Sequence, residues 1–362
     1  MEVVEEGKVK IFLERFRKYK GPGKREPGFY NPTLEIDRDI NVLFCQYIAN
    51  KGAKYFLDGL ASTGIRGIRI AKEVGGDIEV DINDINPKAH ELIKKNMKEN
   101  NVNANALNEN LCILLHKKRY DYIDIDPYGS PIPFIPCIFK GIRRKAYASI
   151  TATDTATLCG VYKKACIRKY HAIPLRLQAV KEIGMRILLG YIAKQSASYD
   201  FAFKPMLSFS YSHFFRIYGY FEKGARKANE NIAKIGWIYW DNGWKVSKLD
   251  ELPTINYAGP LWIGELHDVE LVKKLKEYLE ERNFKRKKEL GKYIDLFLEE
   301  TKLPPMYYES SYVAKDLKVK QPKLNKIIEK LKEEGFEAGR NHFDFNSFKT
   351  NAPYEEIKRV FV

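Results

Sequence analysis

Hydrophobic and polar residues follow a regular order in the first 150 residues of the chain. Short apolar runs that end in an acidic residue alternate with longer segments of helical period. The runs predict strands at 54–58, 78–84, 120–126 and 147–154, with a short segment near Ala106. Helices are predicted at 40–50, 64–74, 86–100 and up to about residue 116. This repeated β-α-β order predicts an α/β fold with a parallel, doubly wound, Rossmann-like sheet.

The pattern changes after residue 154. A long helical segment (174–198) precedes two strand-like runs (201–210 and 213–221), and a hairpin is predicted to turn at Asp241-Asn242-Gly243. Past Gly264 the helices are rich in Lys and Glu. The last part predicts a small α+β winged-helix-like domain, with helices at 312–317 and 322–334 and a wing at 336–350. We therefore predict domains at 1–263 and 264–362, and a Pro/Gly/basic linker at 20–28.

The composition indicates what kind of molecule the protein binds. The 362-residue chain has a formal net charge of +15 and a pI of about 9.3. Such a balance favours a polyanion, and nucleic acid first. A basic thermophile surface is the alternative. We expect no membrane span, since no run approaches 18 apolar residues, and the chain start lacks a signal-peptide core. No obligate protein partner is evident.

The cysteines and histidines predict neither disulfides nor a metal. Five cysteines are scattered without a CxxC pair, and six histidines are separated: the cysteines are Cys45, Cys112, Cys137, Cys159 and Cys166. An odd, unpatterned set is typical of a reducing compartment and contains no cysteine-type zinc site. We therefore expect a cytoplasmic protein that needs no metal.

The stretch "LDGLASTGIRG" (57–67) lies between a predicted strand and a predicted helix. Asp58 and Asp84 end successive strands, where ligands bind in open α/β sheets, and Asp84 is suited to accept from ribose hydroxyls. The pyrophosphate pattern G-x-G-x-x-G is missing, which favours a nucleoside without phosphates, such as S-adenosylmethionine. A plain β-α turn is the alternative for the glycines.

The stretch "YDYIDIDPYGSP" (120–131) carries the candidate chemistry. An exocyclic amine on a base is a poor nucleophile, because its lone pair is delocalised into the ring. The Asp126 carboxylate and the Pro127 carbonyl would hold both amine hydrogens, and Asp126 could take the released proton. Tyr128 offers a stacking face for an extruded base. Asp126 could instead cap the next helix, and Asp124 could be a second acid or a buried partner of an arginine.

The chain also resembles the tRNA guanine-26 N2-dimethyltransferase family, in order and over nearly its whole length. The matching pieces are "FYNPTLEIDRD" (29–39), "LDGLASTGIRGIR" (57–69), "NDIN" (83–86), "DIDPYGSP" (124–131), "TATDTATLCG" (151–160), "GARK" (224–227), "GPLWIG" (259–264) and "HF…KTNAPY" (342–354). The resemblance implies a class I methyltransferase domain with a family-specific C-terminal domain. It also implies transfer of one or two methyl groups from S-adenosylmethionine to N2 of guanine 26 in tRNA.

The resemblance assigns roles to single residues. Phe29 and Tyr128 would sandwich the flipped guanine, and Asp126 would hold its N2. Cofactor contacts fall on Arg38, Asp58, Gly59, Arg66, Asp84, Ile85, Asn108 and Glu109. Arg38 could instead be a salt-bridged surface residue, and Phe29 could pack a linker. The chain departs from the family at "LNENL" (107–111), where an acid is expected near the adenine, and it lacks the paired cysteines of a zinc knuckle.

Further cations are candidates for tRNA contact: Arg168, Lys169, Arg226, Lys227, His342 and Lys349. A solvated helix face is the alternative for Arg168 and Lys169, and stabilisation of the wing is the alternative for His342 and Lys349. Two other functions stay open on the sequence alone. One is methylation of another nucleic-acid amine, such as adenine N6, and the other is a non-catalytic RNA-binding paralog.

Overall fold

The computed structural model describes residues 2–13 and 28–362. Of the predicted linker at 20–28, only Gly28 lies within the described residues. The chain divides into two compact units. Unit 1 contains residues 1–153, 216–223 and 273–291, and unit 2 contains 154–215, 224–272 and 292–362. The predicted boundary after residue 263 does not follow this division and stays a prediction.

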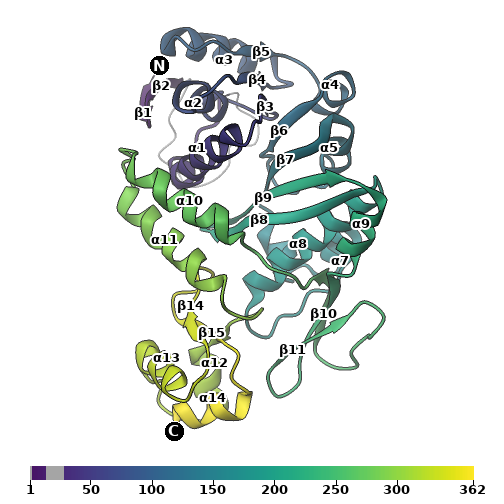
Figure 1. Cartoon of the computed structure of the whole chain (residues 1–362), viewed down its shortest axis with the longest axis vertical. Coiled ribbons are helices and arrows are strands. Elements are labelled where there is room, and N and C mark those ends of the chain that lie inside the picture. The colour runs from purple at the N-terminus through teal and green to yellow at the C-terminus, as the bar shows by residue number, and fades with distance from the viewer. Residues whose placement is uncertain (1, 14–27) are drawn as a thin grey trace. The chain divides into compact units, whose positions relative to one another are not determined.

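The main sheet has seven strands in the order β5-β4-β3-β6-β7-β9-β8 (Figure 1). Neighbours among β5, β4, β3, β6 and β7 are parallel, which confirms the predicted Rossmann-like α/β class. The strands are β3 (Tyr55–Asp58), β4 (Glu79–Asn83), β5 (Asn105–Leu107), β6 (Tyr120–Ile125), β7 (Ile142–Ala152), β8 (Phe201–Tyr211) and β9 (Phe214–Lys223). Apolar side chains in the middle strands, such as Phe56, Ile82 and Ile123, are fully buried.

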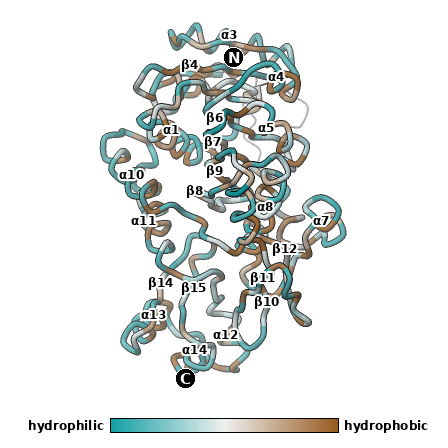
Figure 2. Tube along the Cα trace, turned by 45° about the vertical axis from the view of Figure 1, so that its right-hand side comes forward, coloured by the Kyte–Doolittle hydropathy of each residue, from teal (hydrophilic) through white to brown (hydrophobic). Residues whose placement is uncertain are grey.

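Helices connect these parallel strands in unit 1. They are α2 (Ile65–Glu73), α3 (Pro87–Asn100), α4 (Leu111–Lys117) and α5 (Ile135–Gly141). A 3-10 turn η1 (Pro32–Leu34) and helix α1 (Glu35–Asn50) precede the first of the strands. The predicted start of α3 is confirmed, because the Asn86 side chain accepts the Lys88 N–H and Pro87 takes the first helical position. Figure 2 shows α3 as mainly hydrophilic, which agrees with its sequence, since only five of its fourteen residues are buried.

An N-terminal hairpin, absent from the sequence predictions, completes unit 1. Its strands are β1 (Glu2–Glu6) and β2 (Val9–Leu13). The backbone N–H groups of Lys10 and Phe12 donate to the side chains of Asn100 and Asn96, each at 2.8 Å. These bonds tie β2 to α3 and place Glu6 in the interior.

In unit 2 the long helix α8 (Val180–Ala197) packs on β8 and on β12 (Tyr257–Trp262). A Cβ on Gly190 would lie 2.9 Å from the Leu261 backbone, so glycine permits this close approach. The helix was predicted from 174, but begins at Val180 after Ala179 in the left-handed region. The remaining elements here are α6 (Thr155–Leu158), α7 (Lys163–Tyr170), α9 (Ala225–Ile232), β10 (Ile235–Trp240) and β11 (Trp244–Lys248).

The C-terminal part of unit 2 has the predicted helix pair and wing. Its three-stranded sheet has the order β13-β15-β14, and Val313, Ile327, Leu331 and Phe348 lie in one hydrophobic core. The elements are β13 (Tyr308–Glu309), α12 (Ser310–Asp316), α13 (Leu324–Glu333), β14 (Ala338–Arg340), β15 (Ser347–Thr350) and α14 (Tyr354–Phe361). Helices α10 (Val269–Glu280) and α11 (Lys287–Glu300) precede them.

The expectation of no disulfide is wrong for one pair of cysteines. Cys112 on α4 and Cys137 on α5 form a disulfide, whereas Cys45, Cys159 and Cys166 are free. Helices α4 and α5 pack against each other, which brings the Cα atoms of the two cysteines to 5.2 Å from each other. The 25-residue separation of the two cysteines matches no short motif, so spacing could not reveal the pair.

The part of the chain that the structure describes contains no helix with the length and hydrophobicity of a membrane span.

Candidate functional site

Acidic residues gather where β3, β4 and β6 end. Asp58 lies opposite Asp124 in the register of β3 and β6, and Asp84 follows β4. Gly59 comes directly after Asp58, and a Cβ there would lie 2.8 Å from the Asp124 carbonyl oxygen. Only glycine therefore fits this turn without displacing β6. Burial, followed by repulsion from Asp124, raises the pKa of Asp58, whose carboxylate accepts the Gly67 N–H at 2.8 Å.

Asp84 organises the loop that follows β3. One carboxylate oxygen accepts the Ser62 N–H and the other accepts the Asn86 N–H, each at 2.8 Å. The Asn108 side chain donates to the Asp84 carbonyl at 2.8 Å, and the neighbouring Ile85 is exposed. These predicted cofactor residues thus lie together. Glu109, in contrast, forms an ion pair with Lys117 at 2.6 Å, which together with a backbone N–H lowers its pKa.

Arg38 is buried and does not lie on the surface. Its guanidinium donates to both carboxylate oxygens of Glu6 and to the Asn31 carbonyl, and it lies over the Tyr30 ring. Burial alone would raise the pKa of Glu6, but Arg38 and Arg69 lower it to about 2. Arg38 is therefore fixed by the N-terminal hairpin, so the alternative of a surface salt bridge is wrong.

Arg66, another predicted cofactor residue, lies among carboxylates. Its Nη2 donates to Asp37 at 2.7 Å and to Asp126 at 2.8 Å, and its Nε lies 3.4 Å from Asp124. The Nη1 group is buried and has no hydrogen-bond partner among the described residues. Arg66 thus holds the candidate catalytic carboxylate and retains one donor for a bound group.

Asp126 does not cap a helix, because the next helix, α5, begins only at Ile135 with Phe134 as its N-cap. Its side chain is 23% exposed, whereas that of Asp124 is fully buried. The next residue, Pro127, is buried. Two roles were predicted for Asp124, a second acid or a buried partner of an arginine. The second role fits the structure, because Asp124 pairs with Arg66 and with Arg216.

Phe29 and Tyr128 form an aromatic pair beside these carboxylates. Their ring centroids are 5.2 Å apart and the rings meet edge to face at 76°. The Ser62 hydroxyl donates to the Phe29 carbonyl at 3.2 Å, which links the pair to the Asp84 loop. Burial, followed by the charges of Asp84 and Asp126, raises the pKa of the Tyr128 hydroxyl. The structure therefore brings together the predicted base-stacking and cofactor residues.

The predicted tRNA contacts on α7 and α9 belong to unit 2. Arg168 is exposed, and Lys169 lies 3.4 Å from Asp154. Arg226 is 94% exposed and lies 3.2 Å from Glu230, one turn further along α9, and Lys227 is exposed as well. These positions leave the cations accessible, as contact with a phosphate backbone requires.

His342 and Lys349, in contrast, lie inside unit 2, with exposed fractions of 3% and 2%. The predicted RNA contact does not fit these positions, because both side chains are used internally. Lys349 pairs with Glu182 at 3.1 Å and with Glu300 at 3.3 Å, and His342 Nδ1 lies 2.5 Å from Glu300. The burial agrees with the alternative role, which is to stabilise the wing.

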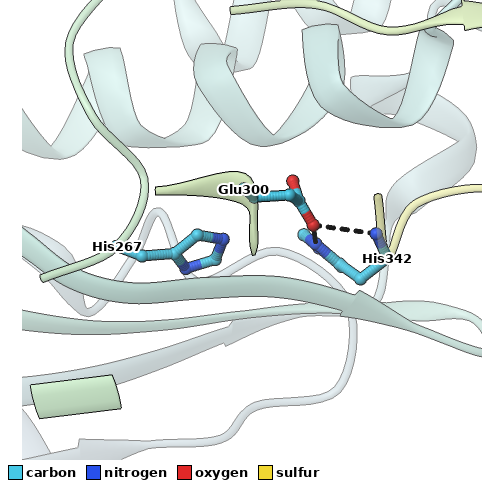
Figure 3. A group of neighbouring side chains, drawn as sticks. All are labelled: His267, Glu300 and His342. Carbon is cyan, nitrogen blue, oxygen red and sulfur yellow. Dashed lines mark hydrogen bonds and ion pairs between the residues drawn. The ribbon is translucent and has the colours of Figure 1, made fainter. Parts of the chain in front are cut away.

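His267, Glu300 and His342 form a cluster whose candidate ligand atoms lie within 4.8 Å of one another (Figure 3). A cavity of about 220 Å³ borders His267 and Glu300. Within the described residues neither ring nitrogen of His267 has a hydrogen-bond partner, and burial lowers its pKa to about 3.

Two contacts disfavour a metal in this cluster. His342 Nε2 accepts the Ser210 N–H at 3.2 Å, which assigns the ring proton to Nδ1, the atom facing Glu300. His342 therefore presents no lone pair to an ion, and the Lys349 ammonium lies beside the same carboxylate. The absence of a metal stays a prediction.

Sequence reasoning missed several residues that support the site, among them Glu6 and Arg216. Arg216 lies in an apolar strand, β9, and is fully buried. A lone charge in such a run signals a buried partner, but its acidic partner Asp124 is 92 positions away.

Known proteins resemble this chain over nearly its whole length. The family model for N2,N2-dimethylguanosine tRNA methyltransferase matches residues 7–362. The tRNA (guanine(26)-N(2))-dimethyltransferase of Pyrococcus horikoshii is 36% identical over 382 residues, covering 99% of this chain and 98% of the relative. That of Methanocaldococcus jannaschii is 36% identical and covers 92% of both chains. The solved structure of Trm1 from Pyrococcus horikoshii with S-adenosyl-L-methionine has a TM-score of 0.90 at 34% identity, over 99% of both chains. The chain therefore belongs to the N2,N2-dimethylguanosine tRNA methyltransferase family.

Proposed function

We propose that the protein transfers one or two methyl groups from S-adenosyl-L-methionine to N2 of guanine 26 in tRNA. The observation that carries this proposal is the partly exposed carboxylate of Asp126 next to the Phe29–Tyr128 ring pair. A flat base needs an aromatic slot, and its exocyclic amine needs an acceptor at the edge of that slot. Family membership supports the same reaction.

Asp126 acts on the amine of the guanine. The carboxylate of Asp126 and the carbonyl of Pro127 accept the two N2 hydrogens, which concentrates the lone pair on nitrogen and directs it at the methyl group. The cofactor supplies that methyl group on a sulfonium. The nitrogen–carbon bond forms as the bond between the methyl carbon and the sulfonium sulfur breaks, and the electron pair of that bond stays on sulfur as a neutral thioether. Positive charge develops on N2, and the Asp126 carboxylate stabilises it and then accepts the proton.

The aromatic pair has to open before a base can enter. Two stacked contacts of about 3.5 Å require the rings to be about 7 Å apart, whereas the centroids are 5.2 Å apart and edge to face. We infer that the guanine displaces one ring from the other and replaces their edge contact with two stacking contacts. Tyr128 is the side chain with room to move, since it is 46% exposed.

The cofactor fits the ends of β3 and β4. The Gly59 turn keeps this region free of a side chain, and Asp84 stands where ribose hydroxyls can donate to its carboxylate. The unpaired Nη1 of Arg66 and the buried Arg38 supply positive charge for the carboxylate of the methionine part. Asn108 lies next to Asp84 and is better placed than the ion-paired Glu109 to meet the adenine.

The cations of α7 and α9 are the proposed tRNA contacts, together with the winged-helix-like part at 264–362. Arg168, Lys169, Arg226 and Lys227 would neutralise phosphates, which makes binding salt-dependent. We keep the cytoplasm as the proposed compartment.

The test uses tRNA transcripts and labelled cofactor. We expect N2-methylguanosine and N2,N2-dimethylguanosine at position 26, identified by mass analysis of nucleosides, and no transfer when guanine 26 is replaced by adenine. Duplex DNA is the comparison substrate. Methyl transfer to DNA, or to an adenine amine, would contradict the proposal.

A further inference from the structure

Arg216 is a deeply buried charge near the site. It belongs to β9 and has no exposed surface. Its Nη1 donates to the Thr151 hydroxyl at 2.6 Å and its Nη2 to the Ser149 hydroxyl at 3.0 Å. These two hydroxyls come from β7, so the guanidinium is fixed against a central strand.

Arg216 closes a ring of four alternating charges. Its Nε lies 3.1 Å from Asp37 and its Nη2 donates to Asp124. Asp37 and Asp124 are in turn the partners of Arg66, at 2.7 Å and 3.4 Å. All four side chains are buried. The remaining partner of Arg66, Asp126, is partly exposed and so connects this buried ring to the substrate slot.

A buried ring of ion pairs adds little to the free energy of unfolding. Two guanidinium groups and two carboxylates lose their hydration, and buried ion pairs often contribute no more to stability than apolar residues of the same volume. What the ring provides is geometry, because each guanidinium donates a directed hydrogen bond to one carboxylate, Arg66 to Asp37 and Arg216 to Asp124. The other two contacts of the ring are ion pairs at 3.1 Å and 3.4 Å. Arg66 cannot turn away from Asp126 without breaking contacts with Asp37 and Asp124.

We propose that Arg216 is a positioning residue for methyl transfer, acting through Asp37, Asp124 and Arg66 to hold the Asp126 carboxylate at the amine. The proposal rests on the proposed role of Asp126. Arg66 is then more than a cofactor contact, because one of its nitrogens orients the catalytic carboxylate. Arg216 itself touches neither substrate nor cofactor.

The test is Arg216→Lys, which keeps one positive charge and removes the fork. A single ammonium cannot reach Asp37, Asp124, Ser149 and Thr151 with the same directions. A displacement of about 1 Å can lower a rate about 100-fold. We expect the single-turnover methylation rate to fall at least about tenfold. Cofactor and tRNA affinities should fall much less than the rate, because Arg216 itself touches neither and Arg66 keeps its contacts with Asp37 and Asp126.

A double-mutant cycle separates positioning from general damage. Arg216→Lys is made in the wild type and in Asp126→Ala. If Arg216 acts through Asp126, its replacement lowers the rate in the wild type but has little effect in Asp126→Ala. Thr151→Val, which removes one contact of Arg216, should show the same dependence with a smaller loss. If Arg216→Lys does not fold, Thr151→Val is the variant that tests the proposal.

Arg186→Lys is the matched control, because Arg186 is equally buried and pairs with Glu182 in unit 2. Its melting temperature should fall while its rate is unchanged. A folded Arg216→Lys enzyme with the wild-type rate would overturn the proposal, and so would an equal loss in both Asp126 backgrounds. A wild-type rate for Asp126→Ala alone would be a different failure, that of the proposed mechanism.

Discussion

The edge contact between Phe29 and Tyr128 predicts a specific non-additivity. Replacing either residue by alanine removes one stacking contact with the flipped base, worth about 1–3 kcal/mol. It also removes, from the free enzyme, the edge contact that the base must break, worth about 0.5–1.5 kcal/mol. With midpoints of about 2 and 1 kcal/mol, each single variant should lose about 1 kcal/mol, or about fivefold in kcat/KM.

The double variant Phe29→Ala/Tyr128→Ala loses both stacking contacts with the base. The cost of breaking the edge contact between the two rings is avoided only once, because there is only one such contact. The loss in the double variant is about 3 kcal/mol, or about 150-fold, whereas independent residues would give about 25-fold. The assay is single-turnover methyl transfer at subsaturating tRNA and saturating cofactor. Tyr128→Phe, which keeps the ring, should stay near the wild-type value. A double variant no worse than the product of the two single ones would refute the closed-pair reasoning.

The other predictions concern three carboxylates and the absence of a metal. Asp126→Ala should lower the turnover rate by about 100-fold or more, with little rescue by Asn, while calorimetric cofactor and tRNA binding change only a few-fold; near-normal turnover would exclude its role. Asp84→Ala should weaken cofactor binding at least about tenfold in the same titration, and unchanged binding would remove it from the site. The pKa of Glu6 is lowered from 4.5 to about 2, so its stabilisation is complete above pH 4.5 and disappears toward pH 2. Melting curves of Glu6→Gln should therefore depend less on pH in that window; an unchanged dependence would contradict the ion pairing. Elemental analysis after chelation should find no stoichiometric metal and unchanged activity, which a tightly bound ion at His267 would disprove.

Local signals made much of the fold predictable from sequence. Asn86 and Pro87 fix a helix start within a few residues, and Asn242-Gly243 fixes a hairpin turn, because the conformations they favour do not depend on distant partners. Asp58 and Asp84 were likewise predicted to lie where successive strands end, and they lie at the ends of β3 and β4. The resemblance to the dimethyltransferase family, read from motifs in order, is confirmed.

Long-range contacts were the part that sequence could not supply. Glu6 meets Arg38 and Arg69 across 32 and 63 positions, and Arg216 meets Asp124 across 92. No periodicity records such pairs, since each partner is one charged residue among many. The same limit explains His342 and Lys349, whose exposed-looking wing sequence folds into a buried ion cluster with Glu182 and Glu300.

The disulfide between Cys112 and Cys137 links α4 to α5 and closes a covalent loop that contains the chain between these two helices. The covalent loop contains all of β6 and the whole of the motif from Asp124 to Pro131, so the segment with the proposed catalytic carboxylate is tethered at both ends. A protease cut anywhere within 113–136 would leave the two fragments joined until a reductant is added. Oxidised and reduced protein should therefore differ on non-reducing gels after limited digestion, even where their intact masses are almost the same.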